Sequence, residues 1–128
     1  MKSYTDIEQS KKLAEILPIE SADMAWCNDE YRANLYTVKE MKDTFDAVFN
    51  GWNKYWELIP CWSLSSLLDM LPTLDERNPG FCKDVRCDKW HVYYHSTATL
   101  SIIDTERYDN IIDACYEMIL KLHKQKLL

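Results

Sequence analysis

The chain is short of glycine. Only Gly51 and Gly80 occur among its 128 residues, where average usage of about 7% would give roughly nine. Phosphate-binding loops, dinucleotide-binding fingerprints and nucleophile elbows each need glycines at fixed spacing. The sequence therefore excludes these three motifs, and we expect no bound cofactor.

Basic runs and long apolar runs are also missing. No stretch holds more than two adjacent Lys or Arg, and 15 bases against 21 acids give a net charge of −6. Nucleic-acid binding needs clustered bases that neutralise phosphates, so we expect no nucleic-acid partner. The apolar clusters fall far short of the roughly 20 residues that cross a bilayer, so we expect no membrane span.

Five cysteines are present, an odd number, and the first residues lack the apolar stretch of a secretory signal. Both features favour the reducing cytoplasm as the location. The length predicts a single globular domain over residues 1–128. The surplus of acids over bases lies mainly in the first 72 residues, which hold 12 acids against seven bases.

Helix signals occur at four places. A capping box from Thr5 to Glu8 and the stop at Pro18 predict a helix over 5–17. Helical spacing after a second capping box predicts a helix that ends near Asn50. Asn50-Gly51 also fits a hairpin turn, so residues 38–58 are interpreted either as a helix or as a hairpin. A stripe of leucines between Ser63 and Pro72, and an apolar stripe after Asn110, predict the other two helices.

The period changes to two after Gly80. Alternation over 81–87 and 90–95 predicts a hairpin that turns near Asp88-Lys89, and 99–103 is β-branched enough for a third strand. Residues 22–26 are predicted to form a further short extended segment. The fold class is therefore α+β, with three to four helices packed on one face of a small antiparallel sheet.

Segments 60–72 and 110–123 resemble a group of small uncharacterised proteins encoded in gut bacterial genomes, often in phage or other mobile DNA. The similarity extends to residues 22–24 and to the opening helix, and it is poor over 28–58. No reaction or catalytic residue is assigned in that group. The resemblance therefore implies a phage or mobile-element provenance and no site.

Two groups of residues suggest chemistry. Cys82, Cys87, His91 and His95 have metal-ligand residue types, but a strand would hold the two histidines about 13 Å apart. Satisfied polar residues on a sheet face are the simpler interpretation, and a metal-stabilised domain that uses Cys82, Cys87 and His91 is an alternative.

Cys61 precedes a predicted helix, whose dipole would lower the thiol pKa. With His91 or His95 as base, and Asp84 or Asp104 to orient that base, Cys61 fits a small cysteine-dependent enzyme. The simpler interpretation is that Cys61 packs at the start of the helix.

Aromatic residues are dense, with five Trp and eight Tyr. Trp52, Tyr55 and Trp56 lie in the segment that the predicted core explains least, and such side chains are frequent interface anchors. The leading hypothesis is a non-catalytic accessory protein that binds another protein through an acidic and aromatic surface. The sequence does not give the oligomeric state.

Overall fold

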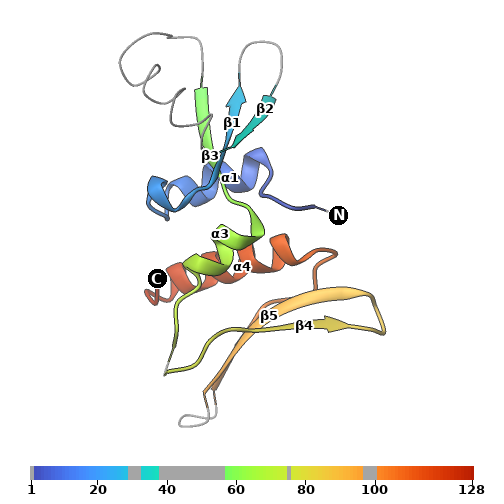
Figure 1. The fold of residues 1–128 in the computed structure, drawn as a ribbon. Helices are drawn as coiled ribbons and strands as arrows, with labels where there is room; N and C mark the ends of the chain where they lie inside the picture. The colour runs from blue at the N-terminus through green and yellow to red at the C-terminus, as the bar shows by residue number, and fades with distance from the viewer. Residues whose placement is uncertain (1, 29–32, 38–56, 75, 97–100) are drawn as a thin grey trace. The chain divides into compact units, whose positions relative to one another are not determined.

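The computed structural model describes residues 2–28, 33–37, 57–74, 76–96 and 101–128 (Figure 1). Its helices contact two small antiparallel sheets, which confirms the α+β class. The chain divides into two compact units, which we call the N-unit (Tyr4–Ser66) and the C-unit (Met1–Ser3 with Leu67–Leu128). The predicted helix or hairpin after residue 38, with Trp52, Tyr55 and Trp56, lies outside the described residues.

Helix α1 (Ile7–Ala14) opens the N-unit. The predicted capping box is wrong by one residue, because Asp6 caps the helix in place of Thr5. Gln9 N donates to Asp6 Oδ1 over 2.8 Å, and Asp6 N donates to Gln9 Oε1 over 3.2 Å. The helix ends three residues earlier than predicted, in a turn where Leu17 N donates to the Leu13 carbonyl.

The N-unit contains a sheet that the sequence indicates only as a short extended piece. Strands β1 (Met24–Asn28), β2 (Ala33–Thr37) and β3 (Glu57–Cys61) form it in the order β2-β1-β3, and both pairs are antiparallel. Pro60 has no N–H to donate, and β3 is an edge strand, where proline is tolerated. Helix α1 packs against β3, and a 3-10 turn, η1 (Ile19–Ser21), precedes β1.

Helix α3 (Leu64–Met70) follows the predicted leucine stripe and ends before Pro72. The predicted cap is confirmed, since Ser66 N donates to Ser63 Oγ over 3.3 Å. Leu67 and Leu71 are buried, as the stripe predicts, whereas Leu68 is exposed.

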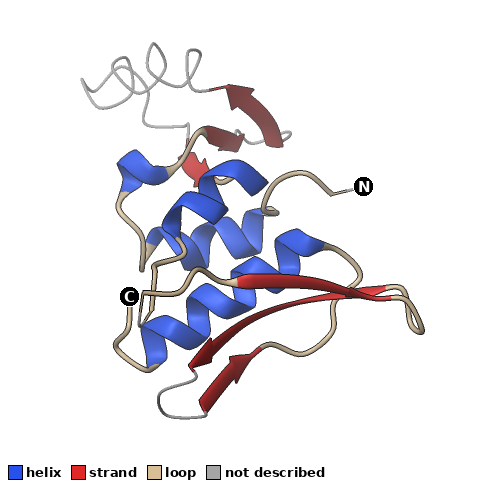
Figure 2. Cartoon of the chain, turned by 60° about the horizontal axis from the view of Figure 1, so that its bottom comes forward, coloured by secondary structure: helices blue, strands red, loops and turns tan. Residues whose placement is uncertain are grey.

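The predicted hairpin and third strand are confirmed in the C-unit. Strands β4 (Gly80–Asp84), β5 (Lys89–Ser96) and β6 (Ser101–Asp104) form an antiparallel sheet in the order β4-β5-β6. The first strand ends three residues earlier than the predicted 81–87, because the turn spans 85–88 and Asp88 adopts the left-handed region with φ 55°. Figure 2 shows β4 and β5 as two long strands joined by this turn.

Helix α4 (Ile111–Lys124) packs against β5 and provides most of the core of the C-unit. The predicted cap is confirmed, since Asp113 N donates to Asn110 Oδ1 over 2.9 Å. Residues 92 and 94 on the inner face of β5 are buried, and the buried face of α4 comprises Ile112, Ala114, Cys115, Met118, Ile119 and Leu122. No helix in the described part of the chain is long and apolar enough to cross a membrane.

Candidate functional site

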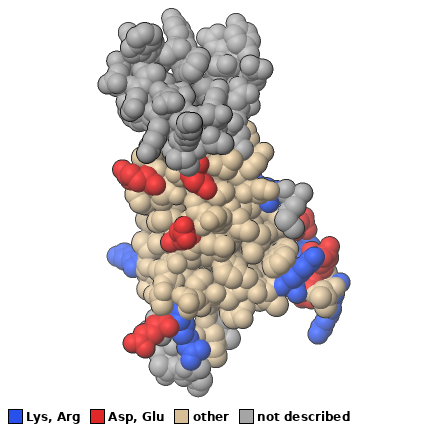
Figure 3. Space-filling view, in the orientation of Figure 1, with Lys and Arg blue, Asp and Glu red and all other residues tan. Residues whose placement is uncertain are grey.

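The N-unit carries an excess of acidic side chains in its described part. Residues 4–26 contain five acids and two bases, and Figure 3 shows acidic groups (red) on the described surface. Glu8 and Glu20 are exposed. Glu15 is exposed as well, and it lies 3.7 Å from Lys12 in a surface pair that contributes little to stability. The acidic bias of the first half of the sequence therefore lies on the surface of the N-unit.

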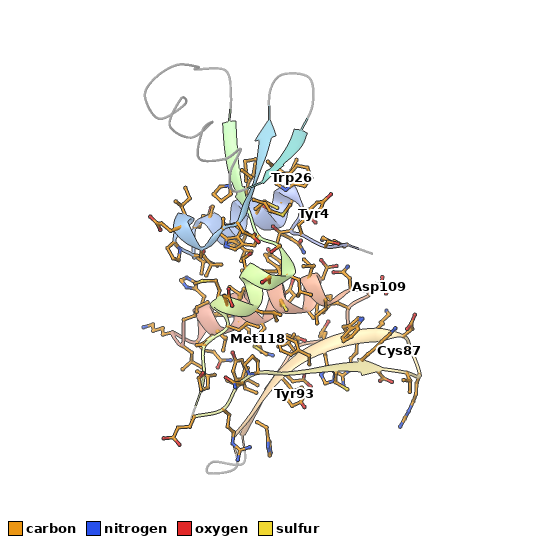
Figure 4. All side chains as sticks on the ribbon, viewed as in Figure 1. Tyr4, Trp26, Cys87, Tyr93, Asp109 and Met118 are labelled. Atoms are coloured by element: carbon orange, nitrogen blue, oxygen red, sulfur yellow. The ribbon has the colours of Figure 1, made fainter. Side chains whose placement is uncertain are left out.

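A pair of aromatic rings belongs to the same unit. Tyr4 and Trp26 pack edge to face, with ring centroids 5.7 Å apart and an interplanar angle of 70°. Both are half-buried, and Figure 4 labels them beside β1. Trp26 Nε1 donates to the Thr5 carbonyl over 3.1 Å, which fixes the orientation of the indole. Such partly exposed rings with a satisfied polar atom are typical of interface anchors.

Asp23 accepts hydrogen bonds that hold two elements of the same unit together. Its carboxylate accepts from Ser63 N and from Ser66 Oγ, each over 2.9 Å, and from Ser63 Oγ in a short bond. These three bonds attach the start of α3 to the residue before β1. We therefore assign Asp23 to the architecture of the unit.

Cys61 lies in a buried polar cluster rather than in an exposed nucleophilic site. Its Sγ donates to the Thr5 carbonyl over 3.4 Å and accepts from Thr5 Oγ1 over 3.6 Å. Burial raises the pKa of the Cys61 thiol, with a smaller contribution from the Asp23 charge. The predicted lowering of this pKa is therefore wrong, because removal from water outweighs any effect of the short helix α3.

His91 and Asp104, two of the predicted catalytic residues, are brought together in the C-unit. His91 Nδ1 lies 2.8 Å from Asp104 Oδ1, and Arg107 lies 3.6 Å from Asp104 Oδ2. The imidazole also stacks on the Tyr93 ring, with centroids 5.5 Å apart. A base and the carboxylate that orients it are thus assembled, whereas Cys61 belongs to the other unit.

The other predicted residues of the C-unit lie on the same hairpin. His95 is exposed on β5, four residues after His91, and Asp84 is opposite Lys89 in the register. Within the described ranges, no three His, Cys, Asp or Glu side chains are grouped so that they could hold a metal ion. Cys82 and Cys87 are exposed free thiols.

A hollow of about 710 Å³ lies along α4 in the C-unit, and sequence reasoning missed it. Its lining combines Lys121 and Lys124 with Glu106 and Glu117. Burial raises the pKa of Glu117, and the charges of Asp113 and Glu106 add to the rise. Because the lining carries both signs of charge, it selects no single class of ligand.

Sequence reasoning also missed the Tyr4–Trp26 pair, because Tyr4 precedes α1 and Trp26 lies on β1, so no local pattern links the two rings.

Comparison of the chain with protein-family models, with curated proteins and with solved structures finds no match. The functional argument therefore rests on the residues and their geometry.

Proposed function

We propose that this chain is an accessory protein that binds a basic partner protein through the acidic and aromatic surface of the N-unit. The observation that carries the proposal is the acid excess of residues 4–26, five against two, in the unit that holds the Tyr4–Trp26 pair. Complementary charge steers association and excludes wrong partners, while partly exposed aromatic rings supply the apolar contact.

Trp52, Tyr55 and Trp56 stay part of this proposal as partner-binding residues. They fall between β2 and β3 in the sequence. A cytoplasmic location and a phage or mobile-element provenance belong to the same proposal. The partner would then be a basic protein of the bacterial host or of the element itself.

The proposal is tested by capture of partners on the immobilised protein at increasing salt. Two double variants change the net charge by the same amount, Glu8→Lys with Glu20→Lys in the N-unit and Asp69→Lys with Glu106→Lys in the C-unit. All four acids are exposed. We expect the first variant to lose about tenfold or more in partner affinity, and the second to bind as the natural chain does.

The salt series and the tryptophans complete the test. Binding is expected to weaken as salt screens the charges, with a screening length of about 8 Å at physiological ionic strength. Trp52→Ala combined with Trp56→Ala should weaken binding in a manner that does not depend on salt. Equal losses in the two charge variants, or none in either, contradict the proposal.

A further inference from the structure

The hydrogen bonds of β5 determine which backbone groups of β4 point away from the sheet. Trp90 N donates to the Tyr108 carbonyl over 2.6 Å, Tyr108 N donates back over 2.8 Å, and Val92 O accepts from Thr105 N over 3.0 Å. In an antiparallel strand the polar groups of successive residues point to opposite sides. Trp90 and Val92 therefore turn away from β4, and the β4–β5 ladder uses residues 80, 82 and 84 of β4.

Phe81 and Lys83 consequently carry the unpaired side of β4. They lie opposite Val92 and Trp90 in the register, so their N–H and C=O groups point away from β5. No hydrogen bond within the described part of the chain uses these backbone groups. Both residues are exposed. A row of free backbone groups of this kind is a template for another strand.

Two other strand edges are protected in ways that β4 is not. Strand β3 contains Pro60, which cannot donate, and it packs against α1. On β6, Lys121 Nζ donates to the Asp104 carbonyl. The charge of Lys83, which could guard β4 against pairing, is compensated within the hairpin, since its Nζ lies 2.8 Å from Asp88 Oδ1 and 5.8 Å from the centre of the Trp90 ring.

We propose that the β4 edge is an interface that binds a second copy of this chain. The two β4 strands run antiparallel about a two-fold axis, so the same patch serves both copies. Phe81 of each copy exchanges both backbone hydrogen bonds with Lys83 of the second copy. The two three-stranded sheets thereby become one continuous sheet.

Charge and backbone chemistry select this register over its neighbours. A shift in one direction places Lys83 opposite Lys83 of the second copy, and like charges directly opposite each other destabilise a sheet. A shift in the other direction places Lys83 opposite Pro79, which has no N–H to donate. Only the register that pairs Phe81 with Lys83 uses all the free groups of both residues and keeps the two lysines apart.

The side chains of β4 fit the same arrangement. Phe81 is 37% exposed although it lies on the face that α4 covers over β5. In the paired strands the two Phe81 rings are diagonal neighbours, within reach of each other across the axis. The two Cys82 side chains lie on the opposite face, at the axis itself, as a pair that shares no backbone hydrogen bond. The Cα atoms of such a pair are about 4.5 Å apart.

The first test is sedimentation velocity of the reduced full-length chain. The contact is small and of the transient class, so concentrations up to about 1 mM are used. Lys83→Pro removes an N–H that points outward and leaves the β4–β5 ladder intact, and Lys83→Ala keeps that N–H as the matched control. We expect Lys83→Pro to weaken dimerisation by about tenfold or more, because it removes the two bonds that the Lys83 N–H groups donate. A monomeric natural chain, or equal dimerisation of the two folded variants, overturns the proposal.

The second test does not depend on the folding of Lys83→Pro. The natural chain is oxidised by dissolved oxygen with a copper catalyst, and linked peptides are mapped by mass spectrometry without reduction. The two Cys82 residues are close enough for a disulfide, whereas Cys87, an equally exposed free thiol, lies in the turn beyond the paired strands. We expect links between two Cys82 residues to form about tenfold faster than any link through Cys87, because dimerisation raises the effective concentration of Cys82 alone. Equal yields of all these links overturn the proposal.

Discussion

Thr5 and Trp62 are bonded to each other in both directions. Thr5 N donates to the Trp62 carbonyl over 2.9 Å, and Trp62 N donates to Thr5 Oγ1 over 3.1 Å. The same hydroxyl lies 2.8 Å from Ser10 Oγ, and all three residues are buried. Thr5, just before the cap of α1, is thus joined to the residue that follows β3.

Thr5→Val should therefore destabilise the protein far more than the small change in the side chain suggests. The change keeps the shape of the side chain and removes the partner of Trp62 N and Ser10 Oγ. Each buried polar group left without a partner costs about 1–3 kcal/mol. Urea unfolding measures the loss, and Thr73→Val, at an exposed threonine bonded to Asn78, should change stability by no more than about 0.5 kcal/mol. Equal effects would show that the Thr5 hydroxyl has no special role.

Asn110→Ala should weaken the start of α4. The amide side chain caps the helix through Asp113 N and also donates to Asp113 Oδ2 over 2.8 Å. Loss of such a cap costs about 1 kcal/mol. Thermal unfolding of this variant is compared with that of Asp109→Ala, whose exposed side chain lies one residue before the cap. If both variants melt at the natural temperature, the cap does not contribute as proposed.

Alkaline pH should destabilise the C-unit through a buried thiol. Burial raises the pKa of Cys115 from 9.0 to about 12. A group whose pKa is raised by folding stabilises the protein fully below its unfolded pKa, and this contribution is lost as pH rises through the folded pKa. Each such group lowers the free energy of unfolding by about 1.4 kcal/mol per pH unit between these two values.

The test is urea unfolding of Cys115→Ala from pH 8 to pH 11, with Cys87→Ala as the exposed control. The slope of stability against pH above 9 should be flatter in the first variant and unchanged in the second. Tyr94 keeps part of the slope in both, because burial also raises its pKa to about 12. An unchanged slope in Cys115→Ala would refute the assignment to this thiol.

Gly80→Ala should disturb the outer face of the C-unit sheet. A Cβ at this position would lie 2.6 Å from Tyr93 Oη and closer still to the ring, so the ring would have to move. Such overpacking costs about 1–3 kcal/mol. In a double-mutant cycle with Tyr93→Ala, the penalty of Gly80→Ala should largely vanish. Additive effects would mean that the ring is not the obstacle.

Local signals predicted the C-unit well. The Asn110 cap and the alternation of β5 depend on residues close in sequence, and each is found where the pattern predicts it. The hairpin is found as well, but its turn over 85–88 begins earlier than the predicted turn near Asp88-Lys89. The register of the hairpin was not predicted, since a turn at Asp88-Lys89 would set Cys82 opposite His95, whereas the observed turn over 85–88 sets it opposite His91.

The structure of the N-unit was harder to predict, because it depends on contacts between residues far apart in the sequence. Thr5-x-x-Glu8 and Asp6-x-x-Gln9 are overlapping capping patterns, and the bonds of Thr5 to Trp62 decide between them. The pairing of β1 with β3 joins segments some thirty residues apart. The environment of Cys61 follows from the same non-local packing, which is why its raised pKa could not be predicted from its place before a helix.

Asp88 limits which sequences can close the β4–β5 hairpin. Its left-handed backbone, φ 55°, is common for glycine, asparagine and aspartate and strained for β-branched residues. Lys83 binds its carboxylate over 2.8 Å, so aspartate adds a bond that glycine lacks. Position 88 should therefore tolerate few substitutions, whereas Val85, 90% exposed in the same turn, should accept nearly any residue. Within this turn, tolerance to mutation is set by backbone conformation and not by burial.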